Sequence, residues 1–131
     1  MLIDTSAWLI IFDTSSSQHP SAMAEYDRTR RRVTYSYVIV ELISLALSRR
    51  HSLSKILDFV FDILHDSEIE LIWIDELTTH QALALLSERR DKSWSLCDAV
   101  SFVLMKQLGI TEALTTDHRF EQAGFIKLLE S

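Results

Sequence analysis

Hydrophobic residues along the chain fall alternately into short runs and into longer stretches with helical spacing. Short apolar runs are typical of buried strands, and apolar positions three and four residues apart are typical of helices. The expected strands are Met1–Ile3, Val33–Ser36, Glu70–Ile74, Glu112–Thr115 and Ile126–Leu129. The expected helices span residues 7–12, 20–31, 38–50, 52–66, 76–90 and 95–108, and the serine-rich segment 13–20 is expected to be a loop. This alternation predicts an α/β fold, a three-layer sandwich with a short central parallel sheet of four or five strands flanked by helices.

Residues near the expected helix ends support these boundaries. Ser6 is expected to cap the first helix, and Pro20 fits the start of the second. Ser95 and Asp98 have the spacing of a capping box, and Gly109 is expected to end that helix. No internal repeat or linker interrupts the pattern, so residues 1–131 are expected to form a single domain.

The apolar residues of two expected helices predict which faces of these helices are covered. The stripe of helix 52–66 is wider than one small core needs, which predicts a homodimer or partner surface there. Its members are Leu53, Ile56, Leu57, Val60, Phe61 and Leu64. In helix 76–90 the residues expected to face inward are Leu77, Leu83, Ala84 and Leu86.

The three tryptophans lie in different sequence contexts. Trp8 and Trp73 fall within apolar runs and are expected in the core. Trp94 lies between two serines and is the candidate for an exposed ring that stacks on a nucleic-acid base.

Composition narrows the class of protein. The chain has 131 residues, 47% of them hydrophobic, with only two glycines and one proline, which favours helices over an all-β fold. Cys97 is the only cysteine, so a disulfide and a thiolate zinc cage are excluded, and a buried thiol is expected. The start lacks the pattern of a signal peptide and no apolar run is long enough for a membrane span, so a cytoplasmic protein without a membrane partner is expected.

The net charge of −6 argues against a nucleic-acid partner, but the distribution of basic residues matters more than their sum. Arginines gather at 28–32, at Arg49 and Arg50, and at Arg89 and Arg90, all near expected helix ends. Each cluster can simply complement a helix dipole, and together they can line a rim that binds a phosphate backbone.

Four acidic residues are candidates for chemistry. Asp4 and Asp117 follow expected strands, at the edge where parallel sheets bind ligands. Glu41 lies within an apolar helix with no basic residue three or four positions away, so it needs a compensating cation, a partner elsewhere or a helix edge that reaches water. Asp98 has the alternative role of capping its helix, and Asp4 and Asp117 can also cap helices.

Four carboxylates at one sheet edge repel one another by roughly 3 kcal/mol per pair at about 5 Å in an effective dielectric near 20. A bound cation stabilises such a set, and oxygen ligands without His or Cys favour Mg²⁺ or Mn²⁺. Such ions activate water and stabilise charge on a phosphate, so phosphodiester hydrolysis is the expected use.

The sequence resembles PIN domains, particularly the VapC-type toxins of prokaryotic toxin–antitoxin pairs. The resemblance spans nearly the whole chain. It rests on Met1-Leu2-Ile3-Asp4-Thr5-Ser6, Val40-Glu41-Leu42, Cys97-Asp98-Ala99-Val100-Ser101-Phe102, Leu114-Thr115-Thr116-Asp117-His118-Arg119-Phe120 and Ala123-Gly124-Phe125.

The resemblance implies a PIN-like fold and a metal-dependent endoribonuclease that acts on RNA. It also implies a homodimer and neutralisation by a small antitoxin protein. Asp4, Glu41, Asp98 and Asp117 match the family's acidic metal site for Mg²⁺ or Mn²⁺, and Ser6 and Thr116 match hydroxyl positions beside it. Arg119 stands where many relatives have a further acid, which favours one-metal chemistry.

Three other functions compete with this interpretation. A phosphatase or phosphoacceptor with Asp4 as nucleophile is disfavoured because Ser6 stands where such phosphatases commonly carry a second acid. A Ser-His-Asp hydrolase is disfavoured because no nucleophile-elbow motif is present and the histidines lie in contexts typical of surface or capping residues. The remaining alternative is a catalytically silent PIN-like module that binds RNA or a protein, against which the four acids argue.

Overall fold

A computed structural model describes all 131 residues, and its strands and helices alternate along the chain as the hydrophobic pattern predicts. The strands are β1 (Leu2–Ile3), β2 (Arg32–Tyr35), β3 (Ile69–Ile72), β4 (Glu112–Leu114) and β5 (Ile126–Lys127). The helices are α1 (Thr5–Phe12), α2 (His19–Arg28), α3 (Ser36–Ser48), α4 (Leu53–His65), α5 (Glu76–Glu88), α6 (Leu96–Leu108) and α7 (Arg119–Gln122). The segment expected to be a loop lies between α1 and α2, with Pro20 in the first turn of α2.

All strand pairs are parallel, and the strand order is β3-β2-β1-β4-β5. From β1 the chain moves outward through β2 to β3 and then returns to the other side of β1 with β4. The order therefore reverses between β1 and β4, where Leu2 lies beside Ala113 and Ile3 beside Leu114. Ligands of open α/β sheets bind at the carboxyl ends of the strands at such a reversal. Here those ends lead directly into Asp4 and Thr115.

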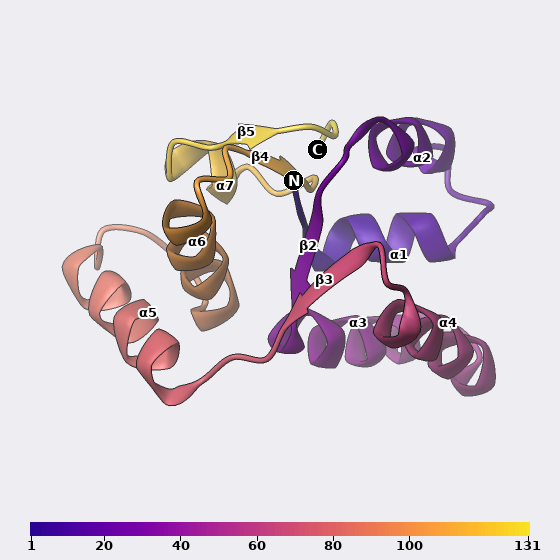
Figure 1. Cartoon of the computed structure of the whole chain (residues 1–131), viewed down its shortest axis with the longest axis horizontal. Coiled ribbons are helices and arrows are strands. Elements are labelled where there is room, and N and C mark those ends of the chain that lie inside the picture. Colours follow the sequence, from indigo (N-terminus) through magenta and orange to yellow (C-terminus); the bar gives the residue numbers. More distant parts are fainter.

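Helices cover both faces of the sheet, with α1 to α4 on one side and α5 to α7 on the other (Figure 1). On the first side, Trp8 of α1 packs edge-on against Tyr26 of α2 and Phe59 of α4. On the second side, Phe102 of α6 packs against Phe120 and the segment after α7. The predicted three-layer α/β sandwich is confirmed.

A chain of buried hydrogen bonds fixes α1 to the middle of the sheet. The Trp8 Nε1–H donates to the Thr34 hydroxyl over 3.1 Å, and that hydroxyl donates to the Ile3 carbonyl over 3.1 Å. Each of these polar groups lies in the core, where an unpaired donor or acceptor is costly. The bonds therefore hold the start of α1, and Asp4 with it, in one position relative to β1 and β2.

Two predictions about tryptophans are wrong. Trp73 is 70% exposed, because it lies just beyond β3, an edge strand with no neighbour to cover it. Trp94 is only 8% exposed: its ring packs against Phe102 and its Nε1–H donates to Gln122 over 2.9 Å. Trp94 is thus part of the core, while Trp8 is buried as expected.

The predicted inward face of α5 is also wrong. Leu77 is 65% exposed and Leu83 is exposed as well, whereas Ala82 is fully buried. Ala84 is exposed and Leu86 is partly buried. The helix packs against α6 through the face that carries Ala82, so its buried stripe is offset from the one that periodicity alone indicates.

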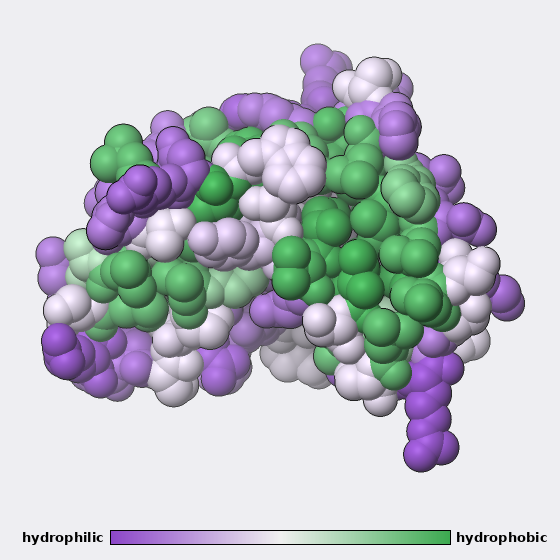
Figure 2. Space-filling model, turned by 90° about the horizontal axis from the view of Figure 1, so that it is seen from below, coloured by the Kyte–Doolittle hydropathy of each residue, from purple (hydrophilic) through white to green (hydrophobic).

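The wide apolar stripe of α4 has both a buried and an exposed part. Ile56, Val60 and Ile63 face the core, while Phe61 is 55% exposed and Leu53 is exposed too. In Figure 2 the apolar residues gather over α3 and α4, with a smaller group over α5. No helix combines the length and the apolar character that crossing a membrane requires.

Candidate functional site

Asp4 follows β1 at the reversal of the strand order and occupies the N-cap position of α1. Its Oδ2 accepts a hydrogen bond from the Thr115 hydroxyl over 2.9 Å and lies 3.5 Å from the Ser6 hydroxyl. Burial, helped by the negative charges of Glu41 and Asp98, raises the pKa of Asp4 to about 7 against the opposing effect of the Thr115 hydrogen bond. No basic side chain forms an ion pair with Asp4. Asp4 is therefore a carboxylate without a compensating positive charge.

Ser6 and Thr115 form a hydroxyl pair beside Asp4. Their oxygens lie 3.2 Å apart, and Ser6 Oγ accepts the backbone N–H of Thr116 over 3.1 Å. The Thr115 hydroxyl also accepts the backbone N–H of Asp117 over 3.0 Å. The prediction that Ser6 caps α1 is wrong, because Asp4 takes the N-cap position and Ser6 lies inside the helix.

Thr115 is a site residue that the sequence analysis missed. Thr116 lines the same groove as Asp4, but the hydroxyl that contacts the Asp4 carboxylate belongs to Thr115. The pairing of Ile3 with Leu114 sets the next residues, Asp4 and Thr115, side by side. That register is a property of the assembled sheet, so the one signal in the sequence was the position of Thr115 as the last residue of the expected strand.

Glu41 lies on α3, where it is exposed and lines the groove that contains Asp4. The buried face of α3 is formed by Val38, Ile39 and Leu42, and Glu41 lies outside it. Glu41 stands at a helix edge that reaches water, one of the alternatives left open by the sequence. Its carboxylate makes no hydrogen bond or ion pair and still raises the pKa of Asp4.

Asp98 combines a structural role with a position near the other acids. The predicted capping box is present: Asp98 N–H donates to Ser95 Oγ over 3.0 Å, and Ser95 N–H donates to Asp98 Oδ2 over 2.8 Å. The side chain is 16% exposed, and burial together with the charge of Asp117 raises the pKa of Asp98. Only Oδ2 of Asp98 takes part in the cap. Oδ1 accepts no hydrogen bond and is therefore available to a ligand.

Arg119 connects Asp98 and Asp117. Its Nη1 lies 3.3 Å from Asp117 Oδ1, and its Nε lies 3.8 Å from Asp98 Oδ2. The backbone N–H of Arg119 also donates to Asp117 Oδ1 over 2.9 Å. One guanidinium thus neutralises part of the charge of these two acids.

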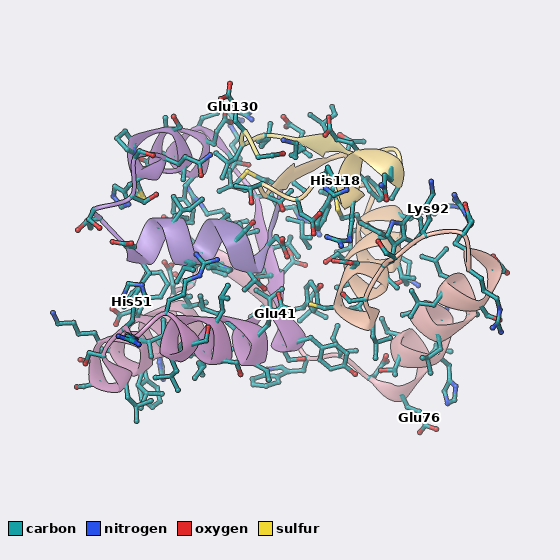
Figure 3. All side chains as sticks on the ribbon, turned by 180° about the vertical axis from the view of Figure 1, so that it is seen from behind. Glu41, His51, Glu76, Lys92, His118 and Glu130 are labelled. Carbon is teal, nitrogen blue, oxygen red and sulfur yellow. The ribbon has the colours of Figure 1, made fainter.

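A groove of about 440 Å³ runs between α1 and α3, and its lining includes Asp4, Glu41 and Asp117. Asp98 does not line this groove, but its charge acts on Asp4, and the charge of Asp117 acts on Asp98. Figure 3 shows Glu41 near the middle of the molecule and His51 toward the end of the same groove. The structure therefore brings three of the four predicted acids to one groove and the fourth beside it.

In this arrangement no three Asp, Glu, His or Cys side chains come close enough together to hold a metal ion. The chemistry of the donors nevertheless suits a hard divalent cation, because all are carboxylate or hydroxyl oxygens. Thr5 Oγ1, next to Asp4 in the groove lining, is the one buried side-chain polar atom without a hydrogen-bond partner. The pKa of Asp4 is raised mainly by burial, and no basic side chain lies against the carboxylate to lower it.

Comparisons with known proteins agree with this architecture. The structure is similar to the sarcin-ricin loop cleaving toxin VapC20 of Mycobacterium tuberculosis, with a TM-score of 0.87, 23% sequence identity and 96% of each chain covered. At that identity the likeness shows a shared fold. A search of curated proteins gives no significant match. The sequence pattern of the PIN domain matches residues 1–126, and the chain therefore belongs to the PIN domain family.

Proposed function

We propose that this protein is a divalent-metal-dependent endoribonuclease that hydrolyses phosphodiester bonds in RNA. The observation that carries the proposal is the gathering of Asp4, Glu41, Asp98 and Asp117 around the reversal of the strand order in a PIN domain. Burial and neighbouring carboxylates raise the pKa of Asp4 and of Asp98, and such an acidic set is poorly suited to bind phosphate unless a cation is added. Metal-assisted hydrolysis of a phosphodiester is a reaction for which such a set of carboxylates is suited.

Asp4 and Asp98 are the proposed principal ligands of Mg²⁺ or Mn²⁺, with Glu41 and Asp117 acting through water. When bound, the ion lowers the pKa of a water molecule and stabilises negative charge on the phosphate. The chain's own groups then have two tasks. Thr115 and Ser6 hold Asp4 Oδ2 in a fixed orientation, and Thr116 lines the substrate groove.

Arg119 supports one-metal chemistry. Its guanidinium lies against Asp98 Oδ2 and Asp117 Oδ1 and neutralises part of their charge, so these acids would hold a second ion less well. Two cations at that position would repel each other at short range. We therefore propose a single ion on the Asp4 side.

The biological role proposed here is that of a toxin in a toxin–antitoxin pair. The VapC20 toxin, which is similar in fold, is described as cleaving the sarcin-ricin loop. By analogy, the substrate is RNA and the regulator is a small antitoxin protein. The alternative is a catalytically silent module that binds RNA or protein; retention of all four acids favours the enzyme.

A homodimer is proposed on the basis of the exposed apolar residues of α3 and α4. Val40, Leu53 and Phe61 are all more than half exposed, and together with Leu47 and Leu64 they form the patch in Figure 2. Exposed patches of this kind commonly mark protein interfaces. A sedimentation experiment that finds a monomer at micromolar concentration, for wild type and for Phe61→Ser alike, contradicts the proposal.

The test of the function is cleavage of total RNA by wild type and Asp98→Asn in Mn²⁺, in Mg²⁺ and in chelator. Asparagine keeps an oxygen for the capping box with Ser95 and removes the charge. Cleavage by wild type only with a metal ion, and loss of cleavage in the variant, is the expected result. Binding of RNA without a divalent ion and without cleavage would establish the silent module instead.

A further inference from the structure

The groove that contains the acids does not end at them. It continues along the packed faces of α1 and α3 to the turn after α3, where Arg49 and His51 line it. On α3 the lining residues are Glu41 and Leu45, and Arg49 follows with the same spacing of four, so all three lie on one side of the helix. The eight residues from Glu41 to Arg49 correspond to about 12 Å along a helix. The acids and the guanidinium of Arg49 thus lie at different positions along one continuous groove.

Arg49 differs from most arginines of this protein in having no partner. The cluster at 28–32 is largely paired with glutamates, through Arg28, Arg31 and Arg32. Arg89 pairs with Asp91, and Arg90 bonds within its own helix end. Of the three sequence clusters expected to line a backbone-binding rim, only the one at Arg49 reaches the acidic groove.

The chain turns sharply to place Arg49 and His51 together. Arg50 has a φ of 64°, a left-handed conformation that non-glycine residues rarely adopt. The His51 N–H donates to the Ala46 carbonyl over 3.0 Å, which closes the turn at the end of α3. The His51 ring then packs edge-on against Phe12, the last residue of α1.

Asp13 is the one acid at this end of the groove. Its Oδ1 accepts hydrogen bonds from the Ser15 N–H and hydroxyl, which keeps the pKa of Asp13 low and its carboxylate engaged in its own turn. The guanidinium of Arg49 is therefore left for a ligand with negative charge.

We propose that Arg49 and His51 form a subsite that binds a backbone phosphate flanking the scissile one in single-stranded RNA. This inference rests on the proposed function, because an RNA strand that reaches the acids from this side must lie along the groove. The guanidinium binds phosphate oxygens through paired N–H donors, and the imidazole adds a further donor. The subsite contributes to substrate binding and holds the strand in register with the acids.

Arg49→Gln is the test, and Arg50→Gln is the matched control. Both changes remove one unpaired, exposed positive charge from adjacent positions, but Arg50 does not line the groove. The dissociation constant of a fluorescently labelled single-stranded RNA is measured by anisotropy in Ca²⁺, and KM and kcat are measured in Mn²⁺. The expected result is a fivefold to tenfold weaker binding and a matching rise in KM for Arg49→Gln, with kcat nearly unchanged and Arg50→Gln close to wild type.

The salt dependence of RNA binding and the effect of uncharged phosphate analogues in the RNA test the subsite more specifically. Loss of one phosphate contact lowers the slope of log K against log salt by about 0.7 for a single strand. Methylphosphonate placed at successive flanking positions of the RNA should abolish the difference between wild type and Arg49→Gln at one position only.

The outcomes separate this subsite from the nuclease proposal. If wild type binds RNA without cleaving it and Arg49→Gln alone weakens binding, the subsite stands and the nuclease proposal fails. If RNA is cleaved and the two variants behave alike, the subsite is overturned, and Arg49 then serves another partner such as an acidic protein segment. Absence of any RNA binding by wild type overturns the subsite as well.

Discussion

The negative charge of the carboxylates is compensated differently in the two halves of the acidic cluster. On one half, Asp4 is held by neutral donors, the hydroxyls of Thr115 and Ser6, and no cation lies against it. On the other half, Arg119 lies against both Asp98 and Asp117. Although these acids belong to one site, only the second half contains its own positive charge. The difference indicates that an added cation stabilises the Asp4 half most, and each prediction below tests that contrast.

The largest effect is expected from Asp4→Asn in metal-free protein. The folded-state pKa of Asp4 is raised from 3.8 to about 7, so folding favours the protonated form. Stability is then undiminished below about pH 4, falls between about pH 4 and pH 7 by up to about 4 kcal/mol for a shift of roughly three units, and levels off above pH 7. Asp4→Asn should remove this fall and be more stable than wild type at pH 8.

Urea unfolding at pH 5 and pH 8 in chelator measures the effect. Asp58→Asn is the control, since it removes an exposed acid of α4. An equal loss of stability with pH in wild type and Asp4→Asn would show that Asp4 carries no unbalanced charge.

A smaller effect is expected from Thr115→Val. Valine has a similar shape, but it removes the hydroxyl that donates to Asp4 Oδ2 and accepts the Asp117 N–H. Loss of such supporting bonds around metal ligands commonly lowers activity or metal affinity by about 10–100-fold. Thr115→Ser keeps the hydroxyl and should retain most of the kcat/KM for RNA cleavage. If the serine variant is as impaired as the valine variant, packing and not the hydrogen bond is what matters at this position.

The smallest effect is expected from Arg119→Gln, which removes the internal cation from the second half. Mn²⁺ should bind about fivefold to tenfold more tightly, because repulsion between the ion and a partly exposed guanidinium is worth about 1 kcal/mol. Arg90→Gln, at an exposed position on the α5 side, should leave Mn²⁺ affinity unchanged. Calorimetric titration measures both. Weaker Mn²⁺ binding by Arg119→Gln would show instead that the arginine organises Asp98 and Asp117 for the metal.

Local patterns predicted most of the architecture. The alternation of short apolar runs with helical stretches, the capping box at Ser95 and Asp98, and the left-handed Gly109 at the end of α6 all depend on residues close in sequence. The parallel topology in turn follows from the alternation of strands and helices. Asp4 and Asp117 were therefore predictable as residues at strand ends.

The features that were missed depend on contacts between distant segments. Trp73 and Trp94 differ in exposure because of an edge strand in one case and Gln122 in the other. The contact of Thr115 with Asp4 depends on the register of β1 and β4, and the exposure of Glu41 depends on which side of α3 meets the core. None of these is determined by the residues next to the position concerned.

The most direct test of the account is titration of Mn²⁺ into wild type and Asp4→Asn at pH 8, followed by calorimetry. The account predicts one ion per wild-type chain and little or no binding by the variant, because Asp4 is the ligand that lacks a positive charge in the protein itself. Equal affinity in the two proteins would contradict the assignment of the cation site to Asp4.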